Sequence, residues 1–291
     1  MTGTARRFQW QNQLEPEMVD AYQTDGYLIL DGFASKARCS ALLARTKQLI
    51  DGFDAEAQRV VFSASGQSHA ASDYFMASAG NISFFLEAGA VDEQGALIKP
   101  KSEAVNKIGH ALHDLDPLFD AFSRSDDMAM LAKGVGFSDP LLLQSMVICK
   151  QPHIGGEVNP HQDSTFLHTT PESCVGFWLA LEDATIENGC MWAEAGAHKQ
   201  SLRTRFHRLS ESDSTMQMSV QDDTPLPDCT TPLPASQGTL ILLHGRLPHT
   251  SPTNSSAKSR YAYALHMIDG AAHYSPDNWL QRRDDMPLRG F

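Results

Sequence analysis

The stretch Asp139–Gln151, "DPLLLQSMVICKQ", marks the point where the character of the sequence changes. From here on, short apolar segments alternate with turns rich in Gly, Pro, Asn and Asp. Segments of this length and composition predict strands, at residues 141–151, 164–169, 175–183, 189–195, 238–245 and 259–268. Because no helical segments separate them, they indicate an antiparallel sandwich or barrel rather than alternating strand–helix units.

The residues before this point are expected to be mainly helical, with one early strand at Tyr27–Leu30. The apolar spacing predicts helices at 15–23, 36–52 (with Ser35 as N-cap and Gly52 just past the end), 102–115 and 125–136. No Pro/Gly/Ser-rich linker separates the two halves. We therefore expect one domain over 1–291, with a helix-rich part at 1–138 and a β core at 139–275. Residues 201–238 are polar and rich in proline, which predicts an excursion or lid outside the core.

Composition narrows the class of function. The chain of 291 residues is 42% hydrophobic, and its 23 basic and 35 acidic residues give a net charge of -12. This charge argues against binding to nucleic acid or to an anionic membrane surface and favours a small-molecule substrate. Five scattered cysteines without a C-x-x-C pair indicate a reducing compartment, and no segment is typical of a membrane span or signal peptide. We expect a cytoplasmic protein, of an oligomeric state that the sequence leaves open.

Candidate metal ligands lie in Asn159–Thr165, "NPHQDST". In extended backbone, residues two apart share a face, so His161 and Asp163 are able to converge on one point. Such a pair is common by chance, and it needs a third ligand. His244 and His249 flank the next turn, "HGRLPH", and the residues leave open which of the two serves. Two histidines and one carboxylate form the facial triad typical of non-haem Fe(II).

Arg260, eleven residues after His249, opens the last apolar segment. A buried arginine needs an anionic partner, and its guanidinium binds carboxylates through two parallel hydrogen bonds. An arginine near a metal with open positions therefore favours a small dicarboxylate co-substrate held at both ends.

These residues, together with several longer segments, resemble the phytanoyl-CoA dioxygenase family of Fe(II)/2-oxoglutarate oxygenases, and within it the domain-containing protein 1 group. The likeness runs from about Gln23 to Leu280 and is carried by "YQTDGYLILDGF", "NKIGHALHDLDP", "QSMVICKQPHIGGEVNPHQD", "LEDATIENGCMW" and "SPDNWLQ". It implies a double-stranded β-helix of the jelly-roll, cupin-like kind, with iron bound by His161, Asp163 and His249. It also implies that 2-oxoglutarate contacts Lys107, Met146, Trp178, Ser251 and Arg260. Without the resemblance, Lys107 reads as the exposed face of a helix, and Met146 and Trp178 as core residues.

The resemblance also implies a reaction. Fe(II), 2-oxoglutarate and O2 would hydroxylate an unactivated C–H bond of a small molecule and release succinate and CO2, with ascorbate as a possible reductant. A carboxylate at Asp163, where related halogenases have a small residue, argues against halogenation. For substrate contacts we expect Phe85, Phe166 and Met191. Two alternatives stay open, a zinc hydrolase and a non-catalytic protein that binds the metal and 2-oxoglutarate.

Overall fold

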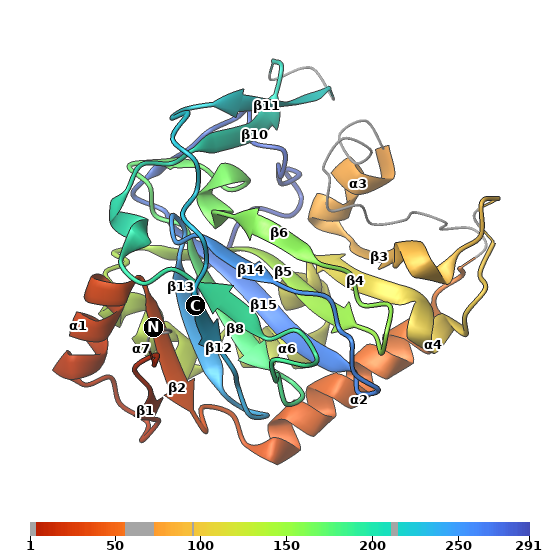
Figure 1. Cartoon of the computed structure of the whole chain (residues 1–291). Coiled ribbons are helices and arrows are strands. Elements are labelled where there is room, and N and C mark those ends of the chain that lie inside the picture. The colour runs from red at the N-terminus through yellow and green to blue at the C-terminus, as the bar shows by residue number, and fades with distance from the viewer. Residues whose placement is uncertain (1–3, 56–72, 95, 211–214) are drawn as a thin grey trace.

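The structure is a computed structural model that describes residues 4–55, 73–94, 96–210 and 215–291. Two β-sheets face each other in a jelly roll, as expected (Figure 1). The larger sheet has the strand order β1 (Phe8–Gln9), β2 (Tyr27–Asp31), β13 (Leu240–His244), β8 (Val175–Ala180), β15 (Arg260–Asp269), β5 (Pro140–Lys150), β4 (Val105–His110) and β3 (Ile82–Leu86). The smaller sheet has the order β12 (Thr231–Leu233), β9 (Met191–Ala193), β14 (His249–Ser251) and β6 (Val158–His161).

The central strand β15 shows how the larger sheet divides its side chains between two environments. Tyr263 and Leu265 belong to the main hydrophobic core on one face of the sheet. On the other face, Arg260, Ala264 and His266 line a cavity between the two sheets. This alternation follows from the two-residue period of a strand, and it turns one sheet into both a core and a wall of the site.

Helices cover the outer face of the larger sheet. The main core joins Leu42 of α2 (Lys36–Gly52), Phe119 of α6 (Pro117–Ser123) and Leu131 of α7 (Asp126–Gly134) to Phe177 of β8 and Tyr263 of β15. Ser35 caps α2 by accepting a hydrogen bond from the Arg38 N–H at 3.2 Å. The predicted helices at 15–23, 36–52 and 125–136 are therefore confirmed, the first as α1 (Pro16–Asp25). Shorter helices are α3 (Asp73–Ala77), α4 (Lys101–Ala104) and α5 (Leu112–Leu115).

The predicted helix at 102–115 is wrong. Its middle, Val105–His110, is strand β4, which pairs with β3 on one side and β5 on the other. Five of its six side chains are buried, and sheet pairing on both sides outweighs a weak helical pattern. Lys107 thus lies in the sheet opposite Ile148, and not on an exposed helical face.

The predicted strand at 164–169 is also wrong for most of its length. The chain forms a 3-10 turn at Asp163–Thr165, in which the Asp163 carbonyl accepts from the N–H groups of Phe166 and Leu167 at 3.0 and 3.1 Å. Only Thr169 belongs to a strand, β7 (Thr169–Thr170), which pairs with β16 (His273–Tyr274). The other five predicted strands correspond to β8, β9 and β13, which lie within their expected ranges, and to β5 and β15, which are displaced from theirs by one residue.

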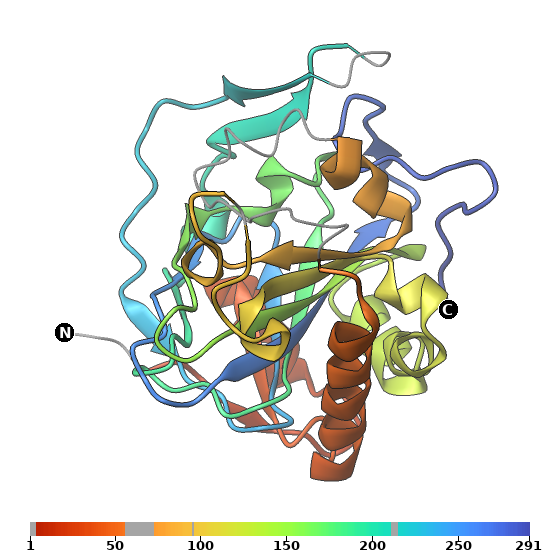
Figure 2. The same ribbon diagram turned by 90° about the vertical axis from the view of Figure 1, so that its right-hand side faces the viewer.

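The segment 201–238 is only in part an excursion. Its first half forms a hairpin of β10 (Thr204–Arg208) and β11 (Met216–Val220), whose tip at 211–214 lies outside the described residues. Figure 2 shows this hairpin on the opposite side of the molecule from α2. Its end is strand β12, which pairs with β9 and buries Leu233 completely. The end of the segment therefore completes the smaller sheet, whereas the hairpin forms a separate two-stranded sheet.

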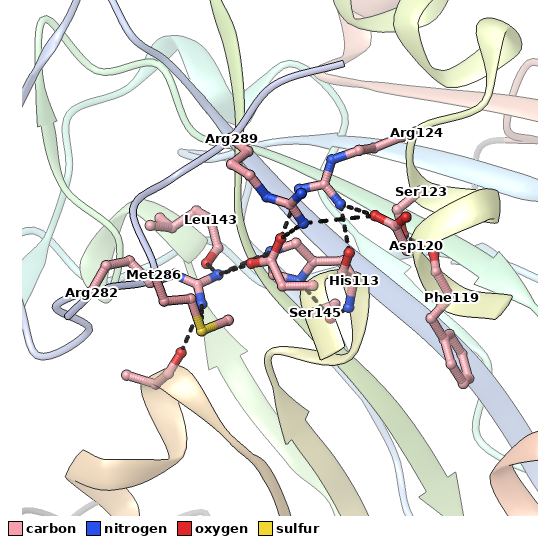
Figure 3. Close-up of polar contacts among 12 residues, drawn as sticks. His113, Phe119, Asp120, Ser123, Arg124, Leu143, Ser145, Arg282, Met286 and Arg289 are labelled. Carbon is pink, nitrogen blue, oxygen red and sulfur yellow. Dashed lines mark hydrogen bonds and ion pairs between the residues drawn. The ribbon is translucent and has the colours of Figure 1, made fainter. Parts of the chain in front are cut away.

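Two arginines near the end of the chain, Arg282 and Arg289, lie beside Arg124 and His113 (Figure 3), and both form ion pairs with Asp114 of helix α5. The Asp114 carboxylate forms ion pairs with Arg124 at 2.8 Å, Arg282 at 3.1 Å and Arg289 at 2.9 Å. His113 Nε2 lies 3.1 Å from the same carboxylate. Burial raises the pKa of Asp114, but the hydrogen bond and charge of His113 and the arginines outweigh it and hold the pKa well below its usual range.

None of the helices in the described part of the chain is long and apolar enough to cross a bilayer.

Candidate active site

A cavity of about 430 Å³ lies between the two sheets. The larger sheet supplies one wall and the smaller sheet with the β10–β11 hairpin supplies the other. Most of the expected site residues line this cavity, namely Lys107, Met146, His161, Asp163, Phe166, Trp178, Met191, His249, Ser251 and Arg260. Phe85 does not line it, because its ring is fully buried behind His110, with the ring centroids 5.8 Å apart.

Three separate elements bring the candidate metal ligands together. His161 ends β6, Asp163 opens the 3-10 turn, and His249 begins β14. Strands β6 and β14 pair with His249 directly opposite His161, so that the two rings lie 4.3 Å apart. One ligand atom from each of the three residues lies within 4.8 Å of the others, which is close enough to surround one ion. His244 is not in this group and packs instead on the ring of His198, at 5.0 Å.

Backbone carbonyls set the tautomer of both histidines. His161 Nδ1 lies 2.8 Å from the Asn159 carbonyl, and His249 Nδ1 lies 3.0 Å from the Leu247 carbonyl. A carbonyl only accepts, so Nδ1 carries the proton and the lone pair of each neutral ring is on Nε2. These Nε2 atoms lie 3.5 and 3.8 Å from Asp163 Oδ1. Three electron-pair donors that face one another repel, so the arrangement suits a cation between them.

The electrostatics of the group agree with a cation site. Burial and then the charge of His161 lower the pKa of His249 to about 4, so its ring is neutral at neutral pH. Burial lowers the pKa of His161 as well, but the hydrogen bond and charge of Asp163 and the hydrogen bond to the Asn159 carbonyl together outweigh burial and raise it. Burial raises the pKa of Asp163, whereas its interactions with His266, His249 and His161 outweigh burial and hold the pKa well below its usual range. A metal ion would replace the proton shared by His161 and Asp163.

Sequence reasoning missed two residues that hold Asp163. His266 Nε2 lies 3.2 Å from Asp163 Oδ2, and the Gln144 amide nitrogen lies 3.2 Å from His266 Nδ1. Where Nδ1 accepts from the amide, Nε2–H faces Asp163 Oδ2, which has no hydrogen-bond partner in the described part of the chain, so the contact is electrostatic and Oδ1 is left directed at the two histidines. A signal was present, because His266 follows Arg260 by six residues in a strand and so shares its face.

Arg260 lies at the other end of the same strand, and none of the described residues forms an ion pair with it. Only 1% of its surface is exposed, and its guanidinium lies 5.5 Å from the centre of the Trp178 ring. Nη2 donates to Ser251 Oγ at 3.1 Å, whereas Nε and Nη1 are buried without a hydrogen-bond partner in the described part of the chain. Burial lowers the pKa of Arg260 to about 10, so the group stays cationic at neutral pH. These buried N–H groups suit an anionic partner such as a carboxylate, which accepts hydrogen bonds from a guanidinium.

Lys107 adds a second cation to this cavity. Its ammonium lies 5.2 Å from the centre of the Phe85 ring, and burial lowers its pKa to about 7. Met146 and Trp178 lie opposite Ala264 on either side of β15, so they form the floor next to Arg260. The two expected polar contacts, Lys107 and Ser251, thus lie on the same cavity as the arginine.

Comparison with known proteins agrees with this geometry. The family model described as phytanoyl-CoA dioxygenase (PhyH) matches residues 22–262. A phytanoyl-CoA dioxygenase of Arabidopsis thaliana is 42% identical over 274 residues, which cover 92% of this chain and 94% of the relative. Phytanoyl-CoA dioxygenase domain-containing protein 1 of Bos taurus is 40% identical over 284 residues, or 94% of this chain and 97% of the relative.

Solved structures show the same fold at low identity. The epimerase SnoN in complex with Fe3+, alpha ketoglutarate and nogalamycin RO superposes with a TM-score of 0.62 at 16% identity, over 94% of this chain and 97% of SnoN. Family match, sequence identity and fold agree over nearly the whole chain. The protein therefore belongs to the phytanoyl-CoA dioxygenase (PhyH) family and is a non-haem iron, 2-oxoglutarate-dependent dioxygenase.

Proposed function

We propose that this protein hydroxylates an unactivated C–H bond of a small molecule. The balance is one O2, one 2-oxoglutarate and one substrate C–H, which give succinate, CO2 and the alcohol. One oxygen atom enters succinate and the other enters the product. The observation that carries the proposal is Arg260, a buried cation with two unpartnered N–H groups on the cavity that also holds the triad.

In this proposal His161, Asp163 and His249 hold Fe(II). The metal supplies the activation of dioxygen when it is bound, and ascorbate serves as the reductant that keeps it ferrous. The carboxylate of Asp163 occupies the position that a halogenase would leave for a halide, which favours hydroxylation. His266 keeps that carboxylate oriented through its 3.2 Å contact.

Arg260 binds the distal carboxylate of 2-oxoglutarate through N–H groups of its guanidinium, while Ser251 accepts from Nη2 and holds the group in place. Lys107, Met146 and Trp178 line the same part of the cavity and confine the chain of the co-substrate. Because these groups are buried, they exclude water from the carboxylate and strengthen its hydrogen bonds. All five cysteines are free, which supports a reducing compartment such as the cytosol.

An anaerobic titration tests this assignment. Apo-protein receives Fe(II) and then 2-oxoglutarate, and the weak visible charge-transfer band of the chelate is recorded for wild type, His249→Ala and the matched control His244→Ala. We expect the band in wild type and in the control, and its loss in His249→Ala. Oxygen is then admitted and succinate is measured with and without candidate substrates.

The outcomes separate the alternatives. A band with no succinate under any condition would favour a protein that binds the metal and 2-oxoglutarate without turnover. Iron that binds without any band would contradict the oxygenase assignment and leave a hydrolase. If the charge-transfer band were lost equally in His249→Ala and His244→Ala, the experiment would not distinguish His249 from His244 as the third ligand.

A further inference from the structure

The cavity continues past the triad, away from Arg260. Register along β15 gives the direction, because Arg260 lies opposite Lys150 and His266 lies opposite Gln144, six residues further along the neighbouring strand β5. At about 3.3 Å per residue, this separates the two ends by about 20 Å. We call the part beyond Asp163 the outer chamber; its walls are Phe75, His110, Gln144, Phe166, Leu167, Thr204, Phe206, Met218, Leu226 and Trp279.

The outer chamber is aromatic. The rings of Phe75 and Trp279 stack at 4.5 Å, and the Phe166 and Phe206 rings lie 5.7 Å apart. Such walls favour flat or branched apolar groups, which gain from burial against ring faces.

His110 places one polar atom in this apolar wall. Ser78 Oγ lies 2.5 Å from the Phe75 carbonyl and 2.8 Å from His110 Nδ1. The hydroxyl has one hydrogen, which it donates to the carbonyl, so it accepts from His110 Nδ1–H. The ring is 1% exposed and lines the cavity, and burial followed by the charge of Lys107 lowers its pKa well below the usual value. The neutral ring therefore presents a bare Nε2, which has no hydrogen-bond partner among the described residues.

A second acceptor lies on the neighbouring strand. Gln144 donates its amide N–H to His266, and its Oε1 is buried without a partner in the described part of the chain. His110 and Gln144 both line the outer chamber, so the two acceptors belong to the same cavity. A buried acceptor without a partner is costly, and a ligand that donates to it recovers that cost.

None of the described residues that form the outer chamber is Lys, Arg, Asp or Glu. Two of the charged cavity residues lie near Arg260: Lys150 lies opposite it, and Glu87 accepts from the Gly156 N–H at 3.2 Å, while the Lys150 ammonium donates to the Gly156 carbonyl at 2.6 Å. Lys107 is the charged residue that acts on His110 from outside the chamber, and burial lowers its pKa to about 7. A phosphate or an ammonium group would therefore find no counter-charge on the described walls of the outer chamber itself, which is unfavourable.

We propose that the outer chamber binds the substrate, and that the substrate is an uncharged apolar molecule whose hydroxyl group donates a hydrogen bond to His110 Nε2. Gln144 Oε1 is the second acceptor for that group or for a neighbouring one. This inference rests on the proposed function, since it names the substrate class of the same site. His110 is then a specificity-determining residue that touches substrate and takes no part in binding iron.

The test uses a matched set of small probes and needs no knowledge of the natural substrate. Binding of 2-phenylethanol, its methyl ether and 2-phenylethylamine to the full-length protein is measured by ligand-observed NMR, with Fe(II) and 2-oxoglutarate absent and then present. The ether keeps the ring and the oxygen but has no hydrogen to donate, and the amine carries a positive charge. We expect the alcohol to bind about 5- to 10-fold more tightly than the ether, and the amine to bind weakest.

Two variants assign this preference to one residue. His110→Phe should bind alcohol and ether equally, whereas the exposed His273→Phe should keep the wild-type preference. Equal binding of alcohol and ether to wild type would overturn the proposal, even if His110→Phe fails to fold. Preferred binding of the amine would overturn it as well. The iron–2-oxoglutarate band, recorded on the same samples, shows separately whether the proposed function stands.

Discussion

Replacing Arg260 by Met should keep or raise the free energy of unfolding of the ligand-free protein, and it should lower the affinity for 2-oxoglutarate. Methionine keeps an unbranched side chain against the Trp178 ring but removes the guanidinium, two of whose N–H groups are buried without a partner. In the protein without co-substrate, each such group costs about 1–3 kcal/mol. The substitution removes the cost of both unpartnered N–H groups. It also loses one hydrogen bond to Ser251, worth about 1 kcal/mol, and the cation–π contact with Trp178, worth up to about 2 kcal/mol.

The free energy of unfolding of the ligand-free variant should therefore stay within about 1 kcal/mol of wild type or rise by a few kcal/mol. Affinity for 2-oxoglutarate should fall sharply. Two charge-assisted hydrogen bonds at about 1.5–3 kcal/mol each give a loss of at least about 3 kcal/mol, or about 100-fold. Iron binding should be nearly unchanged, since the arginine is not among the three candidate ligands.

Thermal unfolding with and without 2-oxoglutarate measures both effects. A ligand at 100 times its dissociation constant stabilises the folded protein by about 2.7 kcal/mol, whereas at the same concentration a 100-fold weaker variant gains only about 0.4 kcal/mol. Arg205→Met is the matched control, because that guanidinium is paired with Asp277 at 2.7 Å and its residue does not line the cavity. A variant that is several kcal/mol less stable but binds 2-oxoglutarate normally would refute the reasoning, because Arg260 would then be a structural cation.

Three further changes test other parts of the structure. Gly176→Ala would place a Cβ 3.1 Å from Asp163 Oδ2, so it should disturb that carboxylate and weaken iron binding by about tenfold, read by titration with Fe(II), while secondary structure by circular dichroism is unchanged. Ser251→Ala removes the acceptor that holds Arg260 and should weaken 2-oxoglutarate binding about 3- to 10-fold in calorimetry; unchanged affinity would show that packing alone positions the guanidinium. Asp114→Asn should cost about 3–5 kcal/mol in urea unfolding at pH 7. The pKa of this carboxyl is lower in the folded than in the unfolded protein, so its contribution to the free energy of unfolding is present above the unfolded pKa near 4 and is lost as the pH falls further. The difference in unfolding free energy between variant and wild type should therefore shrink in acid. A difference that does not depend on pH would contradict the ion-pair assignment.

Much of the fold was readable from local pattern. The strand at Tyr27–Asp31 and the helix after Ser35 follow from apolar spacing, a cap and a glycine turn, and these signals act within a few residues. The residues around Lys107 were misassigned because their strand exists only through pairing with β3 and β5, which are distant in sequence or weakly patterned. Local propensity carries no information about such partners.

The candidate site shows the same division. His161, Asp163 and Arg260 stand out because their residue types and spacing suit a metal and a carboxylate. His266 and His110 did not stand out, since a histidine in an apolar strand is usually a satisfied core residue. Their importance depends on which atoms face Asp163 and the outer chamber, and that is decided by register between strands.

The ion pairs of Asp114 bear on the order in which the chain acquires its structure during synthesis. Arg289 follows Asp114 by 175 residues, and Arg282 follows His113, the neighbour of Asp114, by 169. Until those arginines leave the ribosome, Asp114 has only the nearby Arg124 and His113 as partners. Trp279, which closes the outer chamber against Phe75, is also translated late. The nascent chain therefore contains the three candidate metal ligands before it completes the wall that we propose binds the substrate.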